Sequence, residues 1–184
     1  VQESVASQQI DLGFAETPEE SELYSAKDFQ LLTVVALRED HPLCSRQVLT
    51  AKELDGVPFA TTLPDHHLSI KLQAAFDNVK AQLKVPFHLQ NAASQYVIVE
   101  SGQAVGFMSL LSVWIYRQLR QTGSRKRIVF RPFLPRIFQT VSLITPAHRT
   151  LSQICQQFAY DFEHSIADVI AKTNEEFQFD ELDN

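Results

Sequence analysis

The chain has 184 residues, of which 45% are hydrophobic and 21% are charged, and its formal net charge is −6. This composition is ordinary for a globular protein with one large domain or two small lobes. The negative charge disfavours nucleic-acid binding by this piece of chain, because the basic run at residues 125–127 is too short to hold a phosphate backbone. We expect no membrane association, because no apolar run approaches the roughly 18 residues that a span needs.

The two cysteines, Cys44 and Cys155, lie far apart and match no metal-ligand spacing. We predict that both are free thiols in a reducing compartment, and hence a cytoplasmic location. The chain starts at Val1 without a methionine and without the basic start and apolar core of a signal peptide. These features indicate a fragment of a longer protein.

The first third of the chain predicts alternating short elements. Apolar spacing indicates a helix over residues 1–9 and a strand over 10–15, followed by an acidic loop at 16–22. The β-branched run at 31–37 is typical of a strand buried on both faces. The elements expected next are a helix at 48–54 with Thr50 as its N-cap and Gly56 at its end, a strand at 57–62 and a helix at 69–76.

The remaining elements continue this alternation. They are a strand at 85–89, a helix from 91 or 92 to 101, a strand at 104–108, a helix at 110–119, strands at 128–133 and 138–144, an amphipathic helix at 150–171, and an acidic tail from 172. Strands that alternate with helices predict an α/β fold with a mostly parallel sheet. No glycine-rich phosphate loop is present, so no nucleotide cofactor is expected.

Residues 91–111 are the stretch most suggestive of function. Gly106 lies inside an apolar strand, where a missing side chain often allows another backbone or a ligand to approach closely. Ser109 then opens the next helix, and the free N–H groups of a helix start suit carboxylates and other polar ligand groups. The stretch therefore predicts one wall of a small-molecule site.

Five motifs, taken in order, resemble a known family. They are IDLGFAET at 10–17, REDHPL at 38–43, LTAKELDGVPFATT at 49–62, ESGQAVGFMS at 100–109 and VSLITPAHR at 141–149. Together they resemble the effector-binding domain of LysR-type transcriptional regulators, most of all LysR itself and regulators of amino-acid and opine metabolism. The likeness covers about residues 1–170. It departs from the family at Cys44, where alanine is more usual, and at Gln103, where a small residue is more usual.

The resemblance implies a fold of two Rossmann-like lobes, of the type II periplasmic-binding-protein kind, joined by two crossing strands with a ligand cleft between the lobes. The first lobe would comprise residues 1–60 and 134–171, the second 61–133, and 172–184 would form a tail. The family's winged helix-turn-helix DNA reader and the first strand–helix–strand of the first lobe would precede Val1. Family members pair these domains antiparallel and assemble into tetramers, and the faces of 1–9 and 69–76 are candidates for that contact or for core packing.

Three segments of the second lobe would converge on the ligand. The first contributes hydroxyls and N–H groups at a helix start, the second a polar strand-to-helix turn, and the third the end of the glycine-containing strand. Thr62, Asp65 or Asn91 could equally serve as helix caps, and Phe107 and Met108 could equally be core residues. The residues of the three segments are Thr61, Thr62, Leu63, Asp65 and His66; Asn91 and Ser94; and Gly106, Phe107 and Ser109.

Glu16, with Thr17 beside it, follows the strand at 10–15 where family members often place an effector-facing polar residue. A carboxylate there would pair with an ammonium or guanidinium group, and a helix N-terminus would hold a carboxylate. A ligand with a positive and a negative end has the shape of an amino acid or an amino-acid derivative. The alternative is that Glu16 is a solvated acid beside Glu19 and Glu20.

We expect neither catalysis nor a metal. His66 and His67 are adjacent and so point apart, and no third ligand lies nearby. Cys44 and His41 form the one close cysteine–histidine pair, and no third group is placed to orient them. The predicted function is therefore effector sensing by a transcriptional regulator, with DNA contacted only through the preceding domain. A solute-binding protein of a transport system is the alternative, and an enzyme that uses the cleft is disfavoured.

Overall fold

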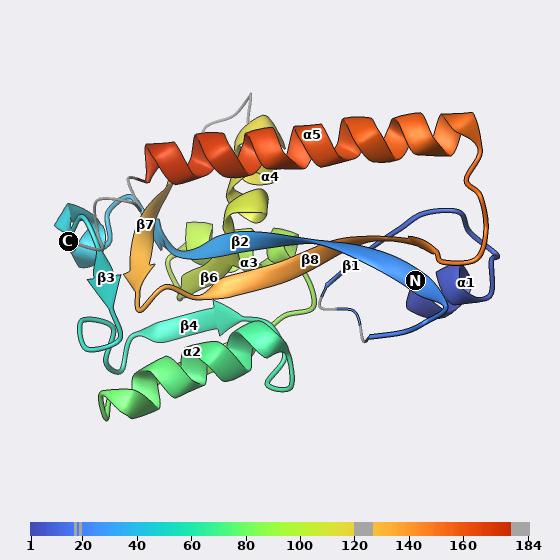
Figure 1. Ribbon diagram of the computed structural model, residues 1–184. Coiled ribbons are helices and arrows are strands. Elements are labelled where there is room, and N and C mark those ends of the chain that lie inside the picture. The colour runs from blue at the N-terminus through green and yellow to red at the C-terminus, as the bar shows by residue number, and fades with distance from the viewer. Residues whose placement is uncertain (17, 19, 120–126, 178–184) are drawn as a thin grey trace. The chain divides into compact units, whose positions relative to one another are not determined.

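The computed structural model describes residues 1–16, 18, 20–119 and 127–177 (Figure 1). Contacts divide the chain into two compact units, unit 1 with Val1–Leu31 and Gln139–Lys172, and unit 2 with Leu32–Phe138 and the residues from Thr173 onward. Strand β2 (Tyr24–Arg38) and strand β8 (Phe138–Pro146) each contribute residues to both units. The lobe boundaries predicted from the resemblance, at residues 60/61 and 133/134, lie outside these two strands.

Unit 1 is built on a small sheet in which β1 (Gly13–Glu16) and β8 are antiparallel. Strand β8 also pairs with β2. Helix α1 (Gln2–Ala6) and most of helix α5 (Gln153–Glu176) complete the unit. Val5, Tyr24 and Ile144 form its core, and a Cβ at Gly13 would lie 2.6 Å from Val1 Cγ1, so the glycine lets the N-terminal residues pack on the sheet.

Unit 2 contains a mixed sheet in which β6 (Val105–Ser109) pairs with β2 and β4 (Pro58–Thr61) lies between β6 and β5 (Lys84–His88). Strand β4 is parallel to both of its neighbours, whereas β2 is antiparallel to β6 and to β7 (Ile128–Leu134). The short strand β3 (Leu49–Thr50) pairs in parallel with β7, after the 3-10 helix η1 (Pro42–Ser45). The expectation of a mostly parallel sheet is therefore wrong, because β2 runs antiparallel to both β6 and β7.

Helices cover both faces of the sheet of unit 2 (Figure 1). Helix α2 (His67–Asn78) packs on the face that carries Val35, Phe59 and Phe107. Helices α3 (Ala92–Ser101) and α4 (Leu110–Leu119) pack on the face that carries Val34, Ala36 and Met108. Burial on both faces explains the continuous apolar run of β2. Within the described residues, none of the helices has the length and apolar character that a membrane-crossing segment requires.

Most of the elements predicted from sequence are present, but the helix predicted at 48–54 is wrong. Leu49 and Thr50 instead form β3, and Leu49 lies opposite Phe133. The Glu53 carboxylate accepts hydrogen bonds from the Thr50 backbone N–H at 3.0 Å and from the Thr50 hydroxyl at 3.1 Å, which closes a turn. Pairing with a distant strand and this local turn together outweigh the weak helical pattern.

The unit boundaries differ from the predicted lobe boundaries. Residues 32–60, expected in the first lobe, belong to unit 2, and unit 2 extends to Phe138 instead of residue 133. The reason is that the second half of β2 forms the middle of the sheet of unit 2, with β6 along one edge and β7 along the other.

Candidate functional site

The candidate site lies where three parallel strands of unit 2 end. Strands β5, β4 and β6 lie side by side in that order and run in the same direction, so their carboxyl ends share one edge of the sheet. Each is followed by a helix, α3, α2 and α4 respectively, whose N-terminus therefore lies at this edge. Along the chain, β5 is added on one side of β4 and β6 on the other. Open α/β sheets bind ligands in the crevice at such a reversal of strand order.

Side-chain caps order two of these helix starts. His66 caps α2, because its Nδ1 accepts a hydrogen bond of 3.2 Å from the Leu68 N–H. Asn91 caps α3 through a 2.9 Å bond that its Oδ1 accepts from the Ser94 N–H. The capping alternative thus applies to Asn91, whereas for α2 the cap is His66 and neither Thr62 nor Asp65. The first N–H groups of a helix have no partner within the helix, so helix starts are suited to bind polar ligand groups.

A pocket of about 390 Å³ opens at the ends of β4 and β5. Its lining contains four residues predicted from the sequence to bind a ligand and three that were not predicted. The predicted ones are Thr62, Leu63, Asp65 and His66, and the others are His67, Leu89 and Gln90. Leu89 and Gln90 directly follow β5, so the parallel pairing of β5 with β4 was the signal that would have identified them. Within the described part of the chain, the lining carries one carboxylate and two imidazoles but no lysine or arginine.

Two buried polar atoms at the same edge have no hydrogen-bond partner in the described structure. They are the hydroxyl of Thr61, the last residue of β4, and Oε1 of Gln95, in the first turns of α3. Thr61 is 1% exposed and Gln95 2%. A buried polar atom without a partner is unusual and costs free energy, so it marks a place where water or a ligand group supplies the bond.

The glycine-containing strand contributes mainly to packing. A Cβ at Gly106 would lie 3.0 Å from Val99 Cγ2 and 3.3 Å from Ala36 Cβ, so the neighbours of Gly106 are core side chains. Phe107 is 1% exposed and packs edge-on against Phe133 with ring centroids 5.4 Å apart. Ser109 lies at the end of β6, at the candidate site's edge of the sheet, with its hydroxyl 3.4 Å from that of Ser112.

The predicted residues outside unit 2 are Glu16 and Thr17. Glu16 is exposed at the end of β1 in unit 1, opposite Val141 of β8. Thr17 lies outside the described residues. The proposed role of Glu16 in ligand binding stays a prediction.

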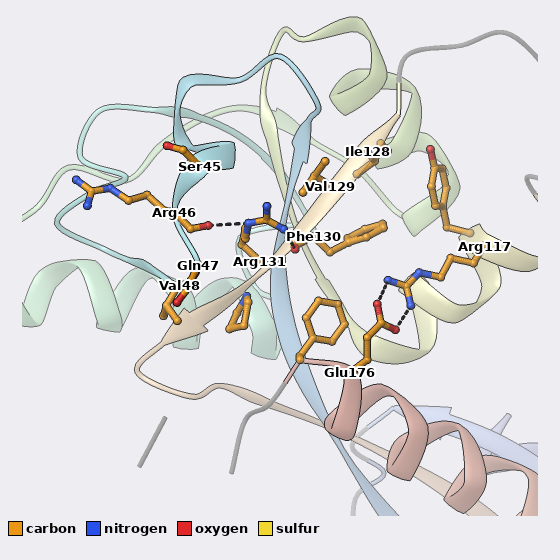
Figure 2. Close-up of a pocket in the computed structure, with 13 residues that line it drawn as sticks. Ser45, Arg46, Gln47, Val48, Arg117, Ile128, Val129, Phe130, Arg131 and Glu176 are labelled. Carbon is orange, nitrogen blue, oxygen red and sulfur yellow. Dashed lines mark hydrogen bonds and ion pairs between the residues drawn. The ribbon is translucent and has the colours of Figure 1, made fainter. Parts of the chain in front are cut away.

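A second pocket, of about 600 Å³, lies elsewhere in unit 2 (Figure 2). Its walls are residues 45–48, the edge of β7, the end of α4 and the end of α5. Arg131 of β7 donates hydrogen bonds to the backbone carbonyls of Cys44 at 2.7 Å, Arg46 at 2.6 Å and Phe130 at 2.9 Å, which fixes the segment after η1. This arginine was not predicted from the sequence, although a charged residue within the apolar run at 128–133 was a visible signal.

Neither nucleophilic nor metal chemistry has a clear location in the described residues. Burial raises the pKa of the Cys44 thiol, and a reactive cysteine needs a lowered pKa. Burial also lowers the pKa of His41, whose Nδ1 accepts a hydrogen bond of 3.2 Å from the Leu43 N–H. No group of three or more metal-ligating side chains is found in the part of the chain that the structure describes.

Comparison with known proteins identifies the family. The family model "LysR substrate binding domain" matches residues 1–160. The chain is 26% identical over 165 residues to the transcriptional activator protein LysR of Escherichia coli (strain K12), a match that covers 86% of this chain and 49% of LysR. The chain thus spans about half the length of this curated relative.

Solved structures of regulatory domains share the fold. The CcmR regulatory domain of Synechocystis PCC6803, solved with 2-PG, matches with a TM-score of 0.65 at 18% identity, over 94% of this chain and 77% of that one. The effector-binding domain of QuiR, solved with shikimate, matches with a TM-score of 0.66 at 12% identity, over 95% of this chain and 77% of that one. At these identities the likeness shows the fold, which is the two-lobed periplasmic-binding-protein-like fold of LysR regulatory domains. The chain belongs to the LysR substrate-binding-domain family.

Proposed function

We propose that this chain senses an amino acid or an amino-acid derivative for a LysR-type transcriptional regulator. The observation that carries the proposal is the shared edge of β5, β4 and β6, at which three helices begin and the 390 Å³ pocket opens. Four predicted ligand-binding residues line that pocket. Family membership supports a regulatory role over the alternative of a transport protein and over an enzyme.

The charges around the pocket support a ligand with both a positive and a negative end. The N–H groups of the helix starts attract a carboxylate. Asp65 lines the same pocket and would repel a simple anion, but it would attract an ammonium group. Because no lysine or arginine lines the pocket among the residues that the structure describes, a strongly anionic ligand is disfavoured relative to a zwitterion.

The buried hydroxyl of Thr61 supports a polar ligand as well. A ligand group that bonds to it would remove the cost of an unsatisfied buried atom, which is about 1–3 kcal/mol. Glu16 of unit 1 stays a separate candidate for contact with an ammonium group.

In the full regulator, effector binding would change how paired domains are arranged and how attached DNA readers sit on their operator. A ligand biases such an equilibrium only when it binds one arrangement more tightly than the other. The chain spans about half the length of LysR. Self-association and DNA contact by the full regulator are therefore part of this proposal.

A thermal-shift screen tests the proposal. A ligand that binds only the folded state raises the melting temperature. We expect a shift with amino acids, opines or diaminopimelate, and calorimetry then gives the affinity. No shift with any of these compounds would refute the ligand class.

Two matched variants test the role of Glu16. Glu16→Gln should weaken binding of the screened ligand by about 1–3 kcal/mol if the carboxylate makes a charge-assisted contact. Glu20→Gln is the control, because Glu20 is an exposed acid on the same acidic segment. Equal affinities for the two variants would remove Glu16 from the site.

A further inference from the structure

Another pocket of unit 2, of about 310 Å³, lies between helix α2 and the segment that joins β7 to β8. Its helix wall consists of Lys71, Ala74, Ala75 and Asn78, whose spacing places them on one face of α2. Residues 135–138 form the other wall. Because the two alanines have short side chains, the middle of the helix wall is hollow, with a lysine at one end and an asparagine at the other.

The wall opposite the helix is anchored to the core of unit 2. Ile137 is 6% exposed and packs in the cluster that contains Phe76 of α2. The Ile137 carbonyl accepts hydrogen bonds from the Thr33 backbone N–H at 3.1 Å and from the Thr33 hydroxyl at 2.9 Å. Arg136 directly precedes this anchored residue. A binding group on such a rigid segment loses little conformational freedom when a ligand arrives.

The lining of this pocket carries positive charge on both walls. Lys71 and Arg136 supply it, and no aspartate or glutamate lines the pocket among the residues that the structure describes. The Lys71 ammonium donates a 2.7 Å hydrogen bond to the Phe138 carbonyl, a neutral group that leaves the charge of the ammonium intact. The Nε and Nη2 atoms of Arg136 are buried, and burial strengthens the attraction between a cation and an anion. Asp77 of α2 lies outside the lining and accepts a 2.8 Å hydrogen bond from Gln73.

We propose that this pocket is a further binding site of unit 2 and takes a small anion with two negative charges, such as a phosphate group. An ammonium and a guanidinium group are the cations that proteins use to bind phosphate, and the amide of Asn78 adds two N–H donors. A volume of about 310 Å³ fits a phosphate alone or with a small organic group attached. The pocket at the ends of β4 and β5 has neither lysine nor arginine in its described lining, so the two sites differ in ligand class.

Three variants and one control follow from the geometry. Lys71→Gln removes one positive charge at an exposed position, and Arg136→Gln removes the other. Ala74→Leu fills the hollow of the helix wall and keeps both charges, and Ala74 is exposed, so the fold should tolerate leucine there. Lys52→Gln is the matched control, because it makes the same charge change at an exposed residue outside the lining.

Nuclear magnetic resonance tests the site through the backbone amide signals of Ala75 and Ile137 during a titration with inorganic phosphate. Sodium chloride keeps the ionic strength constant, so that general screening does not change. We expect a saturable change of both signals in the parent protein. Lys71→Gln and Arg136→Gln should each weaken binding about ten-fold or more, as the loss of a charge-assisted hydrogen bond predicts. Ala74→Leu should prevent saturable binding, and the control variant should bind as the parent does.

Glycerol phosphate is the second probe, and it separates the two sources of this chemistry. It should bind at least as tightly as inorganic phosphate if the site holds a phosphate with an organic group, and more weakly if the site takes the free ion. The proposal is wrong if the parent protein shows no saturable change, or if Ala74→Leu binds phosphate as the parent does. An equal loss of affinity in Lys52→Gln and Lys71→Gln would also overturn it, because the attraction would then be general. Lys71 and Ala74 are exposed, so their variants decide the question even if Arg136→Gln does not fold.

Discussion

Gly102 allows the most direct test of how side chains hold unit 2 together. It ends α3 with φ +75°, a left-handed conformation, and a Cβ there would lie 2.2 Å from Nη1 and 2.3 Å from Cζ of Arg38. Arg38 donates a 2.8 Å hydrogen bond from Nη1 to the Ser101 carbonyl at the end of α3, and one of 2.5 Å from Nε to Asp40. A side chain at residue 102 therefore displaces the guanidinium from the helix end.

The magnitude has two parts. A non-glycine residue in the left-handed region costs about 1–2 kcal/mol. Loss of the charged hydrogen bond to Ser101 costs about 1.5–3 kcal/mol, discounted here because Arg38 is partly exposed and can re-solvate. We expect Gly102→Ala to reduce the free energy of unfolding by about 2–4 kcal/mol.

Gly56 provides a matched control. It also has a left-handed φ, +69°, but a Cβ there would meet no atom within 4 Å. Gly56→Ala should therefore cost only the conformational part, about 1–2 kcal/mol. Urea unfolding with an unchanged m-value measures both variants. In an Arg38→Ala background the cost of Gly102→Ala should fall to that of Gly56→Ala. The reasoning is refuted if Gly102→Ala costs no more than Gly56→Ala in the parent protein.

Three other predictions concern single side chains. Thr61→Val should raise the melting temperature, because it removes an unsatisfied buried hydroxyl that costs about 1 kcal/mol. The same variant should weaken effector binding in calorimetry. If it binds the effector as tightly as the parent protein does, Thr61 does not contact the ligand. Because the pKa of His41 is lowered below 6.5 in the folded protein, the unfolded chain binds the proton more readily, so stability should decline as the pH falls from 6.5 toward the folded pKa. His41→Asn, measured by urea unfolding at several pH values, should decline less over that window, and an identical decline would be against this assignment. Arg131→Lys should reduce the free energy of unfolding by about 1–3 kcal/mol, because an ammonium group lacks the planar guanidinium fork that reaches three carbonyls. A loss below about 0.5 kcal/mol would show that the guanidinium group is dispensable.

The sequence predicts the fold best where local and long-range preferences agree. Asn91 begins α3 and Gly102 ends it, as a polar N-cap and a left-handed glycine should. The strand predicted at 31–37 is only half of β2, because the first half carries polar residues such as Ser25 and Lys27 and has an exposed pattern. That half pairs with β8, a partner more than 100 residues away, which no local pattern reports.

The candidate site was predictable to a similar extent. Residues at strand-to-helix turns, such as Thr62 and His66, were identified because turn chemistry is local. Gln95 was missed, because a polar residue in a helix is usually solvated, and only the packing of α3 against the sheet buries it. The charged groups of the pocket, which include Asp65 but no lysine or arginine among the described residues, also emerged only when β4 and β5 were placed side by side.

Gly106 shows how a residue can serve the site through the fold. The sequence left open whether the missing side chain admits a ligand or a neighbouring element. The surroundings of a Cβ at this position are Val99 of α3, Ala36 of β2 and Met108, all within the core, so the glycine lets α3 pack closely on β6. Because α3 is stiff, close packing at Val99 fixes the position of its N-terminus, two turns earlier at Asn91, relative to the end of β4. The two alternatives are therefore linked: the glycine brings a helix against the sheet, and that helix presents its N–H groups at the edge where the proposed effector binds.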